Sequence, residues 1–319
     1  MTEPYYKYSE YLKQKYGTKT YKLTVNLPLT CPNRDGFLSS NGCLFCGEEV
    51  TGDTVSPDNV RQQLSDSKGF IAERYGADKF IAYFQSYSNT YLPLDTLKPL
   101  LSKAAAFEDV VEIALGTRPD CINQHYLSEI KDAIDSNQSR VNLTIELGLQ
   151  TVNYHTLQSQ NRGHTLAEFI DAVLTAKKFN VEVCAHLILN LPGDDTVDVI
   201  ETAKIVSALS IDTVKLHALF IHKNSQLADR YRKGEVDMIS VDDYIERVIV
   251  FLRHIRPEIA VQRLLGRAPE EETLFVNWGL HWREIHKRIM DEMQQRGVRQ
   301  GDKFDYLGGK ALKKFCLEN

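Results

Sequence analysis

Three cysteines near the start of the chain, Cys31, Cys43 and Cys46, form a C-x11-C-x2-C pattern within TCPNRDGFLSSNGCLFCGEE. The short spacing lets Cys43 and Cys46 reach one metal centre, and the Gly-, Asn- and Ser-rich loop after Cys31 can deliver a third thiolate. Three thiolates are typical of a 4Fe-4S cluster with one iron open to a non-protein ligand. Structural zinc needs four ligands, and Cys121 or Cys184 could supply the fourth only through tertiary contact. A zinc site and unmetallated cysteines remain the alternatives.

The composition limits the classes of protein to consider. A chain of 319 residues, 43% hydrophobic and 25% charged, can bury a large core, which excludes a disordered chain, a collagen and a miniprotein. The net charge of −5 means that a polyanion would have to bind a local basic patch. Six cysteines are too few for a disulfide scaffold. No run approaches the roughly 18 apolar residues of a membrane span, and the start has no signal-like apolar region, so we expect a cytoplasmic protein.

Short apolar runs alternate with longer amphipathic ones from residue 22 to residue 220, which is typical of βα units and a parallel sheet. The expected strands are residues 22–30, 79–85, 110–116, 141–150, 181–191 and 211–220. The expected helices between them are residues 57–75, 94–107, 124–136, 166–179 and 195–209. A spacing of about 30 residues suits a βαβ crossover.

One face of three successive strands is polar. The polar parity carries Thr144, Glu146, Gly148 and Gln150 in the fourth strand, Cys184, His186 and Asn190 in the fifth, and Thr213, Lys215 and His217 in the sixth. A doubly wound sheet would be apolar on both parities, whereas a barrel can have a wet interior. Six units are too few for a complete eight-stranded barrel, so we predict an open, partial (β/α)6 TIM-like barrel. Polar core residues with satisfied hydrogen bonds are the alternative.

The alternation stops near residue 221, and a helical pattern replaces it. Residues 241–254 are amphipathic, and residues 270–296 carry Trp278, Trp282, Ile285, Ile289 and Met293 at helix-face spacing. We therefore expect an α/β protein with three parts: an N-terminal basic and aromatic segment (1–21), the partial barrel (22–220) and a mostly helical C-terminal extension (221–319).

The cysteine pattern after the first strand resembles the radical S-adenosylmethionine (SAM) enzymes. The long gap between the first two cysteines departs from the common C-x3-C-x2-C of that family and is similar to the Elp3-related subgroup of tRNA-modifying enzymes, in particular a bacterial branch with CPNRDG. The resemblance extends over most of the chain through NLPLTCPNRDG, YFQSYSNTY, GTRPDC, ELGLQT, NRGHT, LNLPGDD and KLHAL. It implies a 4Fe-4S cluster and SAM as cofactors, with Cys31, Cys43 and Cys46 as the iron ligands.

The same resemblance suggests positions that hold SAM. Phe45 matches the aromatic position against the nucleoside, and Glu146 looks like the acidic residue that binds the ribose. Gln150 and Arg162 are candidates to orient the SAM carboxylate. Gln85 and Ser86 occupy, by position only, the segment that meets the SAM amine. Gly193 follows the fifth strand, where the backbone can approach the adenine, although an ordinary turn capped by Asp194 or Asp195 explains it equally well. A buried, hydrogen-bonded Glu146 and a capping or surface Arg162 are the corresponding alternatives.

Three polar residues are candidates for the substrate side of the site. Lys215 and His217 lie on the polar parity of the sixth strand, and Arg118 follows the third strand. Each could instead form a structural ion pair.

The branch resemblance implies a substrate. It points to the wobble uridine of tRNA, with conversion of a 5-carboxymethylaminomethyl group to 5-aminomethyl, and to a low-potential electron donor such as flavodoxin or ferredoxin. The first 22 residues carry five lysines interleaved with tyrosines, and residues 285–319 carry eight basic and five acidic residues. Either end could contact RNA, or the first could be a helix packed on the barrel and the second a solvated helix face. A radical SAM enzyme with a small-molecule substrate and a non-catalytic zinc-binding interaction protein are the competing functions. The sequence leaves the oligomeric state open.

Overall fold

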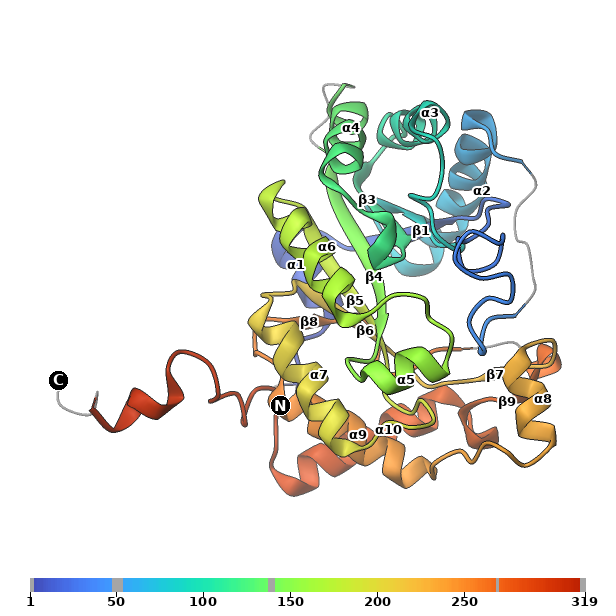
Figure 1. The fold of residues 1–319 in the computed structure, drawn as a ribbon. Coiled ribbons are helices and arrows are strands. Elements are labelled where there is room, and N and C mark those ends of the chain that lie inside the picture. Colours follow the sequence, from blue (N-terminus) through green and yellow to red (C-terminus); the bar gives the residue numbers. More distant parts are fainter. Residues whose placement is uncertain (1–2, 48–53, 137–140, 268–269, 316–319) are drawn as a thin grey trace.

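The computed structural model describes residues 3–47, 54–136, 141–267 and 270–315 (Figure 1). Its main sheet has seven parallel strands in the order β1-β2-β3-β4-β5-β6-β8. These strands are β1 (Thr20–Val25), β2 (Lys79–Phe84), β3 (Val110–Thr117), β4 (Asn142–Gln150), β5 (Glu182–Ile188), β6 (Thr213–His217) and β8 (Ala260–Val261). The crossover helices are α2 (Pro57–Tyr75), α3 (Leu94–Ala105), α4 (Gln124–Asp135), α6 (Leu166–Lys178) and α7 (Thr196–Ala208). The predicted partial barrel is confirmed, with helices along its outer side (Figure 1).

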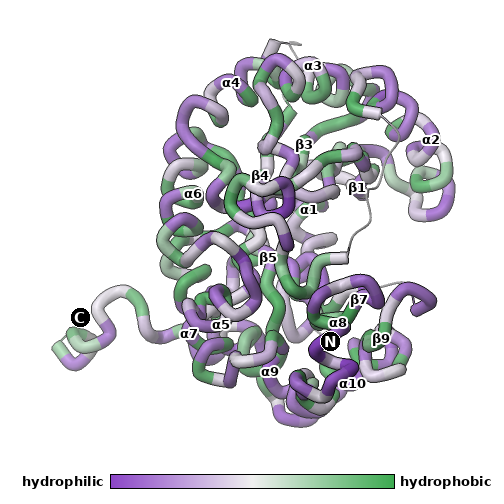
Figure 2. Tube along the Cα trace, turned by 45° about the vertical axis from the view of Figure 1, so that its right-hand side comes forward, coloured by the Kyte–Doolittle hydropathy of each residue, from purple (hydrophilic) through white to green (hydrophobic). Residues whose placement is uncertain are grey.

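The two faces of the sheet differ as the strand parities predicted. On β4, the side chains of Leu143, Ile145, Leu147 and Leu149 join the main apolar core beneath the helices. The opposite parity faces the barrel interior, where Glu146 lies beside Cys184 in the strand register and His186 lies beside Lys215. Figure 2 shows β5 as a largely hydrophobic strand at the centre of the molecule, with hydrophilic residues recurring along the surrounding helices. The helices thus bury the apolar face, and the polar face is left for a site.

The N-terminal segment forms a helix, α1 (Tyr8–Tyr16), that packs against the inner face of the sheet. Leu12 contacts Ile81 and Ala114 there in a small apolar cluster. The Lys15 ammonium forms ion pairs with Glu112 at 2.8 Å and Glu182 at 2.7 Å. The alternative of a helix packed on the barrel therefore describes this tyrosine- and lysine-rich stretch.

The C-terminal region is mostly helical, with α8 (Gln226–Arg232), α9 (Val241–His254) and α10 (Trp282–Arg296), and it also forms a small antiparallel sheet from β7 (Ile221–His222) and β9 (Thr273–Phe275). The expected single helix over residues 270–296 is wrong in its first part. Trp278 has a left-handed φ of +54°. Its ring packs on that of Tyr244, with the ring centroids 5.1 Å apart, and its indole N–H donates to the Ile239 carbonyl. Tertiary packing thus removes Trp278 from the apolar stripe of α10.

The short helix α5 (Tyr154–Ser159), after β4, is a second difference from the expected pattern. Asn153 caps it by accepting backbone N–H bonds from His155 and Thr156. Within the described ranges, the structure contains no helix of the length and apolar composition needed to cross a membrane.

Candidate active site

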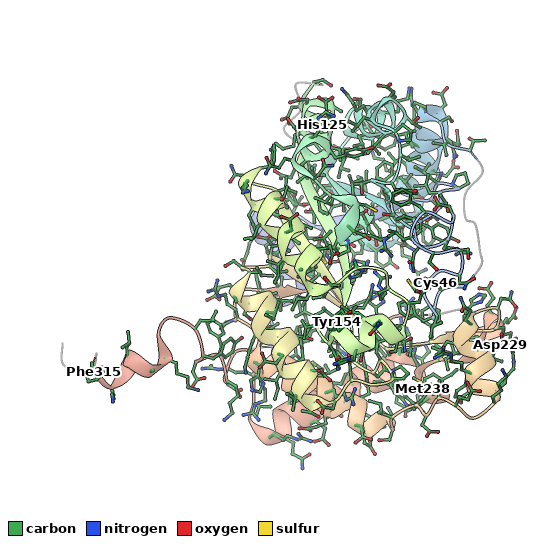
Figure 3. The ribbon with its side chains drawn as sticks, in the orientation of Figure 1. Cys46, His125, Tyr154, Asp229, Met238 and Phe315 are labelled. Carbon is green, nitrogen blue, oxygen red and sulfur yellow. The ribbon has the colours of Figure 1, made fainter. Side chains whose placement is uncertain are left out.

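The three cysteines lie in the loop that follows β1, at the carboxyl end of the barrel strands. The loop is fixed from two sides: the Leu44 N–H donates to the Gln160 carbonyl at 3.1 Å, and the Leu227 N–H donates to the Leu44 carbonyl at 2.8 Å. Figure 3 shows Cys46 in this loop, on the side of the barrel where α8 lies. The loop therefore contacts both the barrel and the C-terminal region. The three cysteine side chains of the loop line one cavity.

Two arginines face the thiols. The Arg162 Nη1 donates to the Cys43 sulfur at 3.1 Å, and Arg118 Nη1 lies 4.0 Å from the Cys31 sulfur. A hydrogen bond from the Cys46 thiol, together with Arg162 and Arg118, lowers the pKa of Cys43 well below its usual value. Donation of that bond and burial raise the pKa of Cys46, and burial raises the pKa of Cys31. The positive groups stabilise sulfur in the deprotonated form that binds metal.

The donor set fits a 4Fe-4S cluster better than closed zinc. Three thiols line the cavity, whereas neither Cys121 nor Cys184, the two cysteines considered for a fourth ligand, is among its lining residues. His186 and Glu146 also line it, but they contact each other at 2.7 Å, and Glu146 is further bonded by Lys22, Lys215 and Gln262. Cys184 instead lies deeper, with its sulfur 3.2 Å from the Gln262 amide nitrogen. Arg162 also lines this cavity, and its Nε is buried and has no hydrogen-bond partner within the described part of the chain.

Two connected chambers occupy the mouth of the barrel. The thiol chamber, about 150 Å³, contains all three cysteines. The second chamber, about 520 Å³, extends toward β6 and the loop after β8 and contains Lys215, His217 and Arg263. Six residues line both chambers: Cys46, Tyr83, Gln85, Tyr87, Gln150 and His186. A cofactor on the thiols would thus face a ligand in the second chamber.

Below the chambers, five inward side chains form what we call the floor network: Lys22, Glu146, His186, Lys215 and Gln262. One Glu146 oxygen accepts from Lys22 and Gln262. The other oxygen contacts His186 at 2.7 Å and Lys215 at 3.3 Å. Both carboxylate oxygens are therefore occupied by protein groups from β1, β5, β6 and the segment after β8.

Burial and ion pairing act in opposite directions on the pKa values of the floor network. Burial opposes ionisation of Glu146, yet Lys215 and Lys22 keep the pKa of its carboxyl well below the usual value. Burial lowers the pKa of Lys215 to about 8 and that of His186 to about 4. Glu146, Cys184 and His186 are close enough together to suggest a metal site. The two lysine ammoniums already neutralise that carboxylate and would repel a cation.

The predicted SAM-binding positions mostly converge on the chambers. Phe45 and Ser86 line the second chamber, Arg162 and Glu146 line the thiol chamber, and Gln85 and Gln150 line both. Gly193 is not among the lining residues of either chamber. It has a φ of +102° in the turn before α7, where Asp195 forms the N-cap, so its geometry is that of an ordinary turn.

The predicted substrate-side residues separate into two kinds. Arg118 forms a two-pronged ion pair with Asp120, at 2.8 and 2.6 Å, and also bonds the Arg162 carbonyl. Lys215 donates to the Tyr83 hydroxyl at 2.9 Å as well as to Glu146. His217 accepts from the Arg263 guanidinium at 2.8 Å, and burial lowers its pKa well below the usual value. Arg118 and Lys215 thus each form an ion pair, which was the alternative for both. Arg118 also lines the thiol chamber, and Lys215 and His217 line the second chamber.

Sequence reasoning missed three arginines of the chambers, Arg34, Arg263 and Arg267. Arg34, in the CPNRDG segment, lines the thiol chamber and donates to the Gly47 carbonyl at 2.8 Å and the Tyr87 hydroxyl at 3.2 Å. Arg34 could have been predicted from its position within the CPNRDG motif. Arg263 has no such signal, because it follows a two-residue strand and reaches the chamber only through tertiary packing.

Comparison with known proteins agrees with the fold and the thiol loop. The family model "Radical SAM superfamily" matches residues 31–206, and the model "Radical_SAM C-terminal domain" matches residues 211–295. The uncharacterised protein YtqA of Bacillus subtilis is 33% identical over 95% of this chain and 94% of its own length. The tRNA uridine(34) acetyltransferase of Methanocaldococcus jannaschii is 24% identical over 59% of this chain and 34% of its own. The structure of Methanocaldococcus infernus Elp3 superposes with a TM-score of 0.66 at 16% identity, covering 88% of this chain and 64% of that one.

Proposed function

The chain belongs to the radical SAM superfamily, and we propose that it modifies the wobble uridine of tRNA, converting 5-carboxymethylaminomethyluridine, with or without 2-thiolation, to 5-aminomethyluridine. Proteins of this superfamily use a 4Fe-4S cluster and SAM. The observation that carries the proposal is the junction of the two chambers, where Cys46 borders both the thiol cavity and a larger basic cavity. The Elp3-like relatives, among them one named for uridine 34 of tRNA, favour this substrate class.

Cys31, Cys43 and Cys46 are the proposed iron ligands. They share one cavity with the Arg162 guanidinium, which offsets the negative charge of a thiolate-bound cluster. When bound, the cluster and SAM supply a 5'-deoxyadenosyl radical that removes a substrate hydrogen. A low-potential donor such as flavodoxin or ferredoxin would supply the electron.

SAM would bind between the two chambers. Phe45, Gln85, Ser86, Gln150 and Arg162 are the proposed contacts because they line the walls on either side of Cys46. Glu146 could reach the ribose only by exchanging partners of the floor network for the ribose hydroxyls. The proposed adenine contact of Gly193 likewise needs SAM to extend beyond the lining of the two chambers.

The substrate would enter the second chamber, next to Lys215 and His217. The bond that must break joins the side-chain amine nitrogen to the carboxymethyl carbon. Loss of a hydrogen atom from that carbon, and then of one electron that the oxidised cluster would accept, would give an iminium. Addition of water would then release the 5-aminomethyl amine, and the carboxymethyl unit would leave as glyoxylate. A hydrogen on that carbon is activated because nitrogen and carboxylate flank it and both stabilise a radical there. The barrel strands and the thiol loop would shield such a radical from competing hydrogen donors.

The test is conversion of a defined tRNA by the anaerobically reconstituted protein. With SAM and a reductant, tRNA that carries 5-carboxymethylaminomethyluridine should yield 5-aminomethyluridine in nucleoside mass spectrometry. The matched Cys43→Ala variant should leave the precursor unchanged. If the wild type cleaves SAM without changing this nucleoside, the small-molecule substrate becomes the better explanation.

A further inference from the structure

Arg263 is a partly buried cation that has no carboxylate within hydrogen-bond distance among the described residues. Its guanidinium bonds only to the His217 ring among the described residues, at 2.8 Å to Nδ1 and 3.2 Å to Nε2. Its Nε is buried and has no hydrogen-bond partner within the described part of the chain. Burial of a charge without an opposite charge is costly, and proteins keep such a charge when a ligand completes the pair.

Two other buried arginines show the usual arrangement. Arg118 forms its two-pronged ion pair with Asp120. Arg247 donates to the carbonyls of Leu189 and Asp194, at 2.9 and 2.7 Å. Arg263 has neither a carboxylate nor a carbonyl oxygen as a partner in the described ranges. Among the described residues, Arg263 therefore differs from the other two in having a histidine ring and no oxygen atom as its acceptor.

The charge of the second chamber points the same way. Lys215, Arg263 and Arg267 line it, and its described lining includes no aspartate or glutamate. The nearest carboxylate of the floor network, Glu146, is shared between Lys215 and Lys22. The end of the chamber between β6 and the loop after β8 therefore carries a net positive charge.

We infer that Arg263, with Lys215 beside it, binds an anionic group of the substrate in the second chamber. A guanidinium presents a planar fork that suits a carboxylate or a phosphate. We assign this anion to the substrate because the proposed partner of the SAM carboxylate is Arg162, which faces the cysteines, whereas Arg263 lines only the second chamber. Only the choice of anion, the carboxymethyl carboxylate or an RNA phosphate, rests on the proposed function.

The first experiment needs no tRNA. N-methylglycine, which carries the carboxymethylamine unit, and inorganic phosphate are titrated calorimetrically into the reconstituted, SAM-bound protein. The wild type should bind at least one of them, and Arg263→Gln should weaken that binding about tenfold or more, because charge-assisted hydrogen bonds are lost. Arg263→Lys should restore part of it. The matched control Arg253→Gln, which removes a cation from an ion pair with Asp302, should bind as the wild type does.

The second experiment identifies the anion. Affinity is compared for tRNA with 5-carboxymethylaminomethyluridine and for tRNA with 5-aminomethyluridine, which lacks the carboxylate. If Arg263→Gln weakens only the first, the partner is the carboxylate; if it weakens both equally, the partner is a phosphate. Both results support the anion site.

Three results overturn the inference: a wild type that binds neither small anion, an Arg263→Gln variant that binds them unchanged, or one whose affinity for SAM falls as much as its affinity for the anion. Failure of the proposed function has a different signature. In that case the anion titration depends on Arg263, but the wild type leaves the tRNA nucleoside unconverted.

Discussion

The charged groups of the floor network are paired with one another, whereas two arginines at the mouth of the barrel have donors without a partner among the described residues. In the floor network, Glu146 is bonded on both oxygens by groups from four parts of the chain. At the mouth, Arg162 and Arg263 each keep a buried Nε without a partner in the described ranges. We interpret the paired network as structural and the unpaired donors as groups available to the proposed ligands. Lys215 belongs to both regions, because it bonds Glu146 and also lines the second chamber.

The largest effect is expected at the thiols. Cys43→Ala should abolish the absorbance of the iron-sulfur cluster near 400 nm and all detectable SAM cleavage, because a cluster cannot be held with an open iron on two thiolates. Cys121→Ala is the matched control, since Cys121 lies outside the thiol chamber, and it should keep both. Full iron content and turnover in Cys43→Ala would contradict the proposal that the thiol chamber holds the cluster.

The second-largest effect is expected in the floor network. Glu146→Gln should lower the free energy of unfolding by about 3 kcal/mol or more, because it leaves Lys22 and Lys215 buried without their counter-charge. Denaturant unfolding measures this. Glu201→Gln, in the surface pair with Lys204, should cost less than about 1 kcal/mol. If Glu146→Gln instead keeps its stability and binds SAM more weakly, Glu146 belongs to the mouth and binds the ribose.

The pH dependence of stability sharpens the same comparison. Burial lowers the pKa of His186 from 6.5 to about 4 in the folded protein, so between these values the unfolded chain binds a proton that the folded one does not. Stability should therefore be greatest above pH 6.5 and should fall as the pH drops toward 4. His186→Gln should reduce this slope by up to about 1.4 kcal/mol per pH unit. An unchanged slope would mean that His186 is protonated in the floor network.

The smallest effect on stability is expected at Arg263. Arg263→Met should change the free energy of unfolding by less than about 1 kcal/mol, or raise it, because a buried charge without a counter-charge is removed. Thermal and urea unfolding of the protein without substrate measure this. A loss as large as that of Glu146→Gln would show that Arg263 is a structural residue like Arg247.

Much of the barrel could be predicted from the sequence because its signals are local. The helix expected at residues 57–75 coincides with α2, and the polar parity of the fourth, fifth and sixth strands is the inner face of the sheet. Strand β8 was missed because two residues carry no periodicity. The position of Trp278 was wrong because its packing partner, Tyr244, lies on α9.

The parts of the site that depend on local sequence were predicted, and the parts that depend on contacts between distant residues were not. The spacing of the cysteines is a local pattern, and it identified residues that do line one cavity. The partners of Glu146 include Lys22 and Gln262, which lie 124 and 116 residues away along the chain. Such pairings, and the absence of one at Arg263, depend on the fold and leave no trace in the neighbouring sequence.

The most direct test of the proposed reaction follows the hydrogen on the carboxymethyl carbon of the substrate. Reconstituted protein is incubated with SAM, reductant and tRNA whose wobble uridine carries a carboxymethylaminomethyl group deuterated on the carboxymethyl carbon. We expect deuterium to appear in 5'-deoxyadenosine as 5-aminomethyluridine forms, because the proposed binding mode would place that carbon beside the cofactor. Conversion of the nucleoside with unlabelled 5'-deoxyadenosine would contradict it.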